Sequence, residues 1–209
     1  SVNAQADRRS DYDELRNLQQ IYGYYFDKAL WDQVVDLFTE DAQLQVGQQG
    51  RFDGKPGIRR YLYGLTGGRQ GLVHGQLNNH FQLSPVITLS PDGLSARARW
   101  RLMVQDGQLG SQANWGAGIY ENEYVKQDGV WKLDYLHGYQ TFYTNYEDGW
   151  AKRASAIFAP YDRLPPASRF RFDLVHLGLG LFQLGSALFD LPLLHGRVEL
   201  HHDVARRHG

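Results

Sequence analysis

Hydrophobic residues recur at helical spacing near the start of the chain. They step by three and four positions at Leu15, Leu18, Tyr22, Tyr25 and Ala29, which predicts an amphipathic helix over roughly residues 11–29. Apolar positions between 31 and 38 predict a second, short helix, and "DAQLQV" at 41–46 predicts a strand. A third helix is predicted for "GKPGIRRYLYGL" at 54–65, because a proline stands near its first turn.

Four strand-like segments follow, over residues 72–89, 94–105, 115–126 and 130–144. Turn sequences such as "SPDG" and "KQDG" separate them, and strands that are joined by short turns pair in an antiparallel manner. Helices followed by a long run of strands predict an α+β fold, in which helices pack on one face of a curved, mainly antiparallel sheet.

The first of these segments has polar side chains at every second position. If "HGQLNNHFQL" is a strand, then His74, Gln76, Asn78, His80 and Gln82 share one face. Such a row either faces water or lines a polar pocket, and the pattern alone leaves both possibilities open.

The last quarter of the chain differs from the rest, so we expect a domain at 1–149 and a C-terminal extension at 150–209. "RLPPAS" interrupts regular structure. The apolar run at 172–191 has its polar members mostly on one stripe, which predicts an amphipathic helix and not a membrane span. This helix could pack on its own domain or a neighbouring subunit, cover a pocket, or associate with a membrane surface.

Charge and composition exclude several kinds of function. The formal net charge is -1, so the chain lacks the positive field that binds nucleic acid or an anionic membrane. The absence of cysteine excludes disulfides, thiolate nucleophiles and Cys-ligated metals. We expect a cytoplasmic protein; "AQA" at 4–6 resembles a signal-cleavage remnant, which leaves the periplasm as the alternative.

Common cofactor and metal motifs are absent from the sequence. There is no Gly-x-x-x-x-Gly-Lys-Ser/Thr loop, no Gly-x-Ser-x-Gly elbow and no His-Glu-x-x-His. His74 and His80 would lie about 20 Å apart along a strand at ~3.3 Å per residue, too far to bind one ion. We therefore expect no metal and no cofactor.

Several blocks agree in order and spacing with a known family. "LRNLQQIYGYYFDKALWDQVVDLFTEDAQLQV", "FDGKPGIRRYL", "LNNHFQL" and "WGAGIYENEYVKQDGVWKLDYLHGYQTFYTNYEDGWAK" resemble the SnoaL-like branch of the nuclear transport factor 2 superfamily, over roughly residues 11–153. The resemblance implies a conical α+β barrel with a deep pocket. Its members include scytalone dehydratase, polyketide cyclases, steroid isomerases and cofactor-independent lyases, among them enzymes that release formaldehyde from lignin-derived diarylpropanes.

The resemblance to scytalone dehydratase carries over to some positions and fails at others. It implies that Asp27 and His80 are pocket residues. The dehydratase tyrosine before the aspartate is Phe26 here, so Tyr24 or Tyr25 would have to replace it. A second catalytic histidine has no counterpart in "RARWRLMVQ", which argues for the same pocket but against the same reaction.

The helical pattern disagrees with the resemblance at Asp27. At ~100° per residue, this residue lies about opposite the apolar stripe of its helix, which predicts a solvated carboxylate. Only the resemblance turns it inward, where it would orient the imidazole of His80.

Other candidate residues each have a structural alternative. If the family topology holds, Asn78 lines the cavity beside His80, and Tyr120, which aligns with a dehydratase asparagine, hydrogen-bonds a substrate oxygen. Further candidates for contact with substrate are Trp100, Arg101, Trp115 and His137. The two tryptophans and the histidine could equally be core residues, and Arg101 could belong to a solvated or subunit-facing stripe.

The residues and the resemblance together lead to one preferred function and two alternatives. The preferred function is a cofactor-independent lyase that removes water, with or without formaldehyde, from a small aromatic substrate such as a diarylpropane. The alternatives are an isomerase or cyclase of the polyketide or steroid type, and a non-catalytic small-molecule-binding module. The resemblance also implies a homo-oligomer, a dimer or a trimer, that associates through the outer face of the sheet.

Overall fold

The computed structural model describes residues 2–47 and 49–152, with side chains from residue 7 onward. Three helices and two strands come first: α1 (Val2–Asp27), α2 (Trp31–Asp36), β1 (Phe38–Val46), β2 (Gly50–Asp53) and α3 (Gly54–Leu65). Four long strands and a short helix follow: β3 (Gln76–Leu89), β4 (Ser95–Gln108), β5 (Gln112–Gln127), β6 (Val130–Asn145) and α4 (Gly149–Lys152). The predicted α+β class is confirmed.

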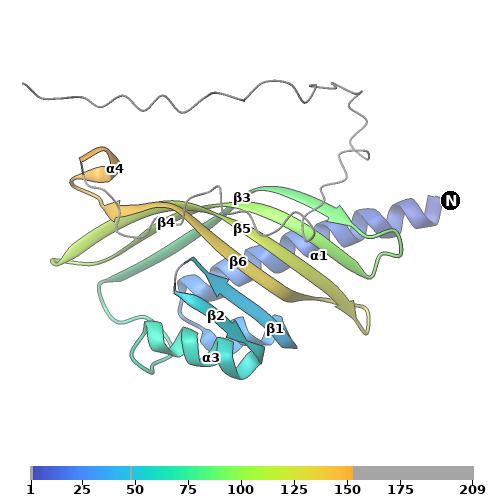
Figure 1. Cartoon of the computed structure of the whole chain (residues 1–209), viewed down its shortest axis with the longest axis horizontal. Coiled ribbons are helices and arrows are strands. Elements are labelled where there is room, and N and C mark those ends of the chain that lie inside the picture. The colour runs from blue at the N-terminus through green and yellow to red at the C-terminus, as the bar shows by residue number, and fades with distance from the viewer. Residues whose placement is uncertain (1, 48, 153–209) are drawn as a thin grey trace, which may run out of the picture. The chain divides into compact units, whose positions relative to one another are not determined.

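The six strands form one curved, unclosed sheet in the order β2-β1-β6-β5-β4-β3 (Figure 1). All neighbours are antiparallel except β1 and β6, which are parallel. Helix α1 contacts mainly β3, and α3 contacts β1 and β2, so the helices cover the concave face of the sheet (Figure 1).

The ends of several elements differ from the sequence-based expectation. Helix α1 begins at Val2 and not near residue 11. The prediction missed this start because the first turns of the helix are polar and show no apolar period. It ends at Asp27, and Ala29 adopts a left-handed conformation with φ of 51° that a helix cannot continue through. Strand β1 begins at Phe38, a residue that the apolar period assigned to the preceding helix, and the short strand β2 was not predicted.

The hairpin between β4 and β5 is longer than predicted. The two strands remain paired up to Gln108 and Gln112, several residues beyond the expected ends at 105 and 115. This extension matters for function, because it brings the polar residues of the segment 105–108, "QDGQ", into the sheet next to β3.

A buried network of polar side chains fixes α1 against the sheet. The Gln19 amide donates to Gln82 Oε1 over 2.8 Å, and Gln19 Oε1 accepts hydrogen bonds from Asn122 Nδ2 and Tyr124 Oη at 2.9 and 2.7 Å. Because buried polar groups are costly unless they are paired, this network fixes the rotation of the helix about its axis.

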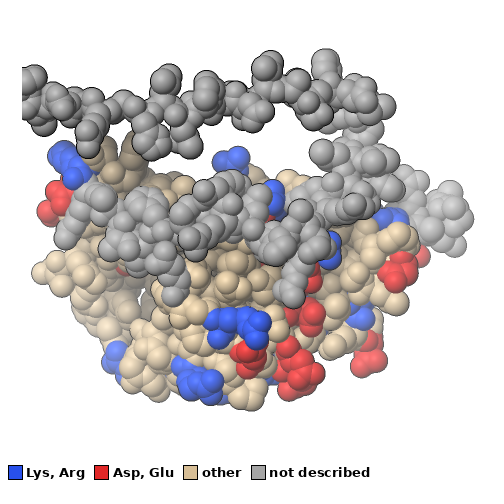
Figure 2. Space-filling view, in the orientation of Figure 1, with Lys and Arg blue, Asp and Glu red and all other residues tan. Residues whose placement is uncertain are grey.

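The expected C-terminal helix at 172–191 lies outside the described residues, so the division at residues 149 and 150 stays a prediction. No helix in the described part of the chain is long and apolar enough to cross a membrane. On the face shown in Figure 2, basic and acidic side chains are interspersed, as the small net charge leads one to expect.

Candidate functional site

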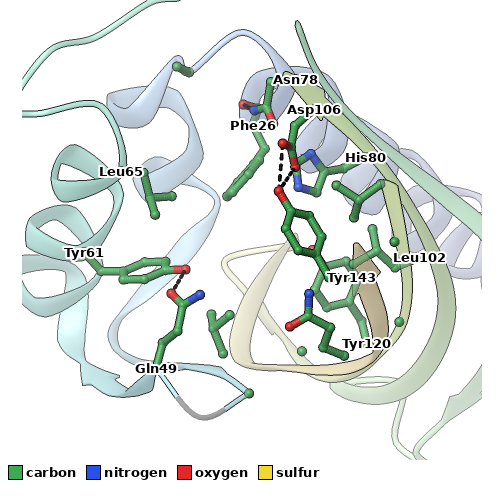
Figure 3. A pocket seen from close by; sticks show the side chains of 18 of the residues that line it. Phe26, Gln49, Tyr61, Leu65, Asn78, His80, Leu102, Asp106, Tyr120 and Tyr143 are labelled. Carbon is green, nitrogen blue, oxygen red and sulfur yellow. Dashed lines mark hydrogen bonds between the residues drawn. The ribbon is translucent and has the colours of Figure 1, made fainter. Parts of the chain in front are cut away.

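A cavity of about 610 Å³ lies between the helices and the concave face of the sheet (Figure 3). Its volume is in the range of sites that hold one small organic molecule. Most of the wall is apolar or aromatic, with contributions from Tyr22, Phe26, Trp31, Leu44, Tyr61, Leu102 and Val104. A few polar side chains interrupt this wall, so the cavity has the composition that is typical of a binding site for an aromatic ligand.

Three glycines on the central strands make room for the cavity. Gly116 and Gly118 of β5 and Gly138 of β6 all line it. A Cβ atom on Gly118 would lie 2.4 Å from the main-chain oxygen of Tyr139, so no side chain fits there. The main chains of β5 and β6 come close together where the register of their pairing shifts. Because glycine carries no side chain, space is left there on the inner face of the sheet.

The last residue of α1 is paired with a cavity residue of β3. Asp27 Oδ1 accepts a hydrogen bond from the main-chain N–H of His80 at 2.7 Å, and lies 3.2 Å from His80 Nδ1. The two side chains are only 14% and 12% exposed. Asp27 therefore faces β3 and His80 and not solvent, although it does not enter the cavity as the resemblance implied. The helical wheel was misleading because β3 covers the side of α1 that the wheel left to solvent.

Asp27 lies behind His80 and is not itself among the residues that line the cavity. When Nδ1 carries the proton, it donates to the carboxylate, and Nε2 becomes the ring nitrogen that can exchange a proton with a ligand. Phe26 packs edge-on against the imidazole, with ring centroids 4.7 Å apart, and so restricts its rotation. The result is an oriented imidazole in an apolar surrounding.

Tyr120 extends into the cavity from β5, directly opposite Gly138 of β6. Tyr22 of α1 packs edge-on against it, with ring centroids 6.1 Å apart. Burial raises the pKa of the Tyr120 phenol well above its ordinary value, although a hydrogen bond from Tyr22 opposes this effect. Burial likewise raises the pKa of Tyr22. Both hydroxyls are therefore neutral hydrogen-bonding groups near pH 7 and not bases.

The polar row on β3 faces α1 and the cavity. Asn78 and His80 line the cavity, and the Asn78 amide donates to the main-chain oxygen of Phe26 over 3.0 Å. Gln82 is buried against α1, and His74 precedes the strand and is exposed. The question that the alternating pattern left open is thus answered by α1, which covers this face of an edge strand.

Five of the other candidates do not line the cavity, and for three of them the alternation of side chains along the strands gives the reason. Arg101, Trp115 and His137 point to the outer face of the sheet, because the adjacent residues Leu102, Gly116 and Gly138 line the inner one. Tyr24 is 71% exposed on α1 and is not among the residues that line the cavity.

Trp100 is buried but is not among the residues that line the cavity. It is 1% exposed, and its indole N–H donates to Tyr124 Oη over 3.0 Å. This tryptophan therefore belongs to the core, which was the structural alternative for it.

The sequence reasoning missed a second polar group in the cavity wall. Asp106 of β4 lines the cavity, and its carboxylate accepts hydrogen bonds from Tyr143 Oη at 2.8 and 2.7 Å (Figure 3). It also accepts a hydrogen bond from Asn114 Nδ2 at 3.0 Å. Burial and then the hydrogen bond to Asp106 raise the pKa of Tyr143. The alternation of Leu102 and Val104 would have pointed to Asp106, had the strand been extended past residue 105.

Within residues 7–47 and 49–152, no group of three or more His, Asp or Glu side chains is arranged to hold a metal ion. The prediction that the chain needs no metal or cofactor remains a prediction.

The fold is similar to that of several solved structures. A candidate scytalone dehydratase of Novosphingobium aromaticivorans is 17% identical, with a TM-score of 0.62 over 77% of this chain and 99% of that one. The dehydrochlorinase LinA-type3 of Novosphingobium barchaimii is 20% identical, with a TM-score of 0.59 over 75% and 99% of the two chains. The ActVI-ORFA protein of Streptomyces coelicolor is 16% identical, with a TM-score of 0.54 over 62% and 96%.

A search of curated protein sequences gave no match. A family model does match: it describes a SnoaL-like domain and spans residues 7–137. These residues include most of α1, the sheet strands up to the middle of β6, and both His80 and Asp106. The chain therefore belongs to the SnoaL-like domain family.

Proposed function

We propose that this protein is a lyase that needs no cofactor and eliminates water from a small aromatic substrate. The observation that carries the proposal is the His80–Asp27 pair, which places an oriented acid–base group on the wall of an apolar cavity. An imidazole can exchange protons near neutral pH, and a positioned group of this kind typically contributes a rate factor of about 10² to 10⁴.

The proposed step uses three side chains. His80 Nε2 removes a proton from the carbon next to the C–O bond, and that C–H pair forms the new double bond as the C–O bond breaks. Asp27 holds the Nδ1 proton and stabilises the imidazolium that forms. Tyr120 hydrogen-bonds an oxygen of the substrate, and the leaving oxygen takes the proton back from the His80 imidazolium and departs as water.

A para-phenol in the substrate would permit a second route, which replaces the removal of a proton from carbon. Ionisation of the phenol can expel a benzylic hydroxyl and give a quinone methide. Deprotonation of a neighbouring CH₂OH group then breaks a C–C bond, its electrons restore the aromatic ring, and formaldehyde leaves. The aromatic walls of the cavity suit such a substrate, and a lignin-derived diarylpropane is the specific example that we propose.

The comparisons support elimination chemistry in general terms. Their names describe a candidate dehydratase and a hexachlorocyclohexane dehydrochlorinase, and both activities remove a small molecule across a C–C bond. The sequences are too distant to transfer a substrate to this chain.

The test is to incubate chelator-treated protein with a panel of phenolic 1,3-diols and hydroxylated polyketide mimics. Products are followed by mass, and formaldehyde is measured in parallel. We expect products that are lighter by 18 mass units, or by 18 and a further 30 where formaldehyde also leaves, and their rate of formation should fall by about 10² or more in His80→Ala. The exposed His74→Ala variant serves as the matched control.

The outcomes separate the alternatives. Isomerised or cyclised products without loss of mass would favour the isomerase or cyclase. Turnover that survives in His80→Ala would transfer the chemistry to other residues. Tight binding of one compound without turnover of any would favour a binding module.

We also propose that the protein forms a homo-oligomer, a dimer or a trimer, through the outer face of the sheet. That face carries half-exposed apolar side chains on β3 and β4, among them Phe81 and its cross-strand partner Met103. Light scattering after gel filtration tests this proposal, and Phe81→Lys should shift the protein towards the monomer, whereas a monomeric wild type would contradict it.

A further inference from the structure

The second polar group of the cavity, at Asp106, has no part in the elimination described above. Its carboxylate lies on β4, opposite Asn78 of β3 and Asn114 of β5. It is half-buried and lines the cavity beside Tyr143 (Figure 3). Hydrogen bonds from Tyr143 and Asn114 hold it in one orientation. A carboxylate that is fixed in this way is a prepared acceptor and not a mobile surface charge.

The carboxylate retains capacity for a ligand. Two carboxylate oxygens offer about four lone-pair sites. The described contacts use two protons, one from the Tyr143 hydroxyl and one from the Asn114 amide. A hydroxyl group that enters the cavity can therefore donate to the remaining sites, in a charge-assisted hydrogen bond that is stronger than a neutral one.

The charge of the cavity also limits what can enter it. Among the described residues that line it, His80 and Asp106 alone carry an imidazole, carboxylate, amino or guanidinium group. A fixed carboxylate without a lysine or arginine partner in the same wall repels a second anion in a medium where water screens it poorly. Aromatic acids and phosphate esters are therefore poor ligands, whereas neutral phenols and alcohols are suitable.

The position of Asp106 relative to the acid–base group fits an aromatic substrate. His80 pairs across the strands with Val104, and Asp106 is two residues further along β4. Diagonal neighbours of this kind are roughly 7–8 Å apart. One aromatic ring can thus span the interval, with its hydroxyl at Asp106 and its reacting side chain at His80.

We propose that Asp106 is a specificity-determining residue that accepts a hydrogen bond from a phenolic hydroxyl of the substrate and excludes anionic aromatic compounds. The assignment rests on the proposed lyase for the orientation of that substrate. Its test uses binding and not turnover, so that the two proposals can fail separately.

The test compares three probes of similar size that carry no leaving group: 4-hydroxybiphenyl, 4-methoxybiphenyl and biphenyl-4-carboxylate. Calorimetry measures their affinities for the wild type and for two variants, Asp106→Asn and Asp106→Leu. We expect the wild type to bind the phenol about tenfold more tightly than the ether and to bind the carboxylate most weakly. In both variants the difference in affinity between the phenol and the ether should be smaller than in the wild type, and it should be smallest in Asp106→Leu. Both variants should bind the carboxylate more tightly than the wild type does.

Two further variants make the result specific. Tyr143→Phe removes the supporting hydroxyl but keeps the carboxylate, so the preference for the phenol should persist. Asp128→Asn changes the same side chain in the turn after β5, where a φ of 50° suits asparagine, and it should leave all three affinities unchanged.

Three results would overturn the proposal. They are equal affinity of the wild type for phenol and ether, no binding of the phenol, and an unchanged preference in folded Asp106→Leu. The first two need only the wild-type protein, so they decide the matter even if a variant fails to fold. If the lyase assay fails while the phenol preference holds and depends on Asp106, the binding role stands without the proposed reaction.

Discussion

His137 should make the stability of this protein fall in mild acid. The imidazole is 7% exposed, stacks on Tyr139 with ring centroids 3.9 Å apart, and has Nδ1 3.2 Å from the hydroxyl of Tyr135. Burial lowers its pKa from 6.5 to about 4. The carboxylate of Glu121 lies opposite on the neighbouring strand, but it is already paired with Arg99.

The sign and the size of the effect follow from linkage. Because the folded pKa is depressed, the unfolded chain binds the proton more tightly, so the contribution to stability is complete above pH 6.5 and is lost as the pH falls towards 4. A pH of 5 lies about 1.5 units below the pKa of the unfolded histidine, and each unit corresponds to about 1.4 kcal/mol of stability. The expected loss between pH 7 and pH 5 is therefore about 2 kcal/mol.

Urea denaturation of the wild type and of His137→Gln at pH 7 and pH 5 measures this contribution. The variant loses packing at both pH values, so the informative quantity is the difference in pH dependence between the two proteins. It should be about 2 kcal/mol, whereas the exposed His74→Gln variant should keep the pH dependence of the wild type. Equal pH dependence in His137→Gln and in the wild type would refute the reasoning.

Three further predictions concern the buried network, the cavity and the site. Gln19→Leu leaves the buried hydroxyl of Tyr124 and its neighbours without their acceptor, so urea denaturation should show a loss of roughly 2–4 kcal/mol; a loss below about 1 kcal/mol would contradict the network's role. Gly118→Val places a Cβ atom 2.4 Å from a main-chain oxygen and should lower the free energy of unfolding by about 3 kcal/mol, which an unchanged melting temperature would disprove. Tyr120→Phe should lower turnover by about 10² with little change in melting temperature, and full activity would remove Tyr120 from the mechanism.

Much of the fold is specified by local pattern. The bounds of α3 coincide with the predicted 54–65, and the four long strands lie where alternation and turn sequences placed them. The apolar stripe of α1 is buried, as its helical period requires. These features depend on a residue and its near neighbours, so one sequence suffices to predict them.

The positions of the polar residues of the site could not be predicted from local pattern. Alternation placed Asn78 and His80 on one face of β3 but could not tell whether that face meets water. The inward position of Asp27 contradicted its own helical wheel, and the resemblance to a family was needed to suggest it. Both outcomes depend on α1 crossing an edge strand, which is a contact between segments about 50 residues apart.

The sequence by itself determined most of the elements, their order and the apolar stripes. Tertiary structure alone decided which polar residues share the cavity. Asp106, Asn114 and Tyr143 come from three strands, and they meet only because the β4–β5 hairpin continues to Gln108 and Gln112. The physical reason is that the register of paired strands and the placement of a helix over them depend on packing between distant segments, and a pattern of neighbouring residues contains no record of that packing.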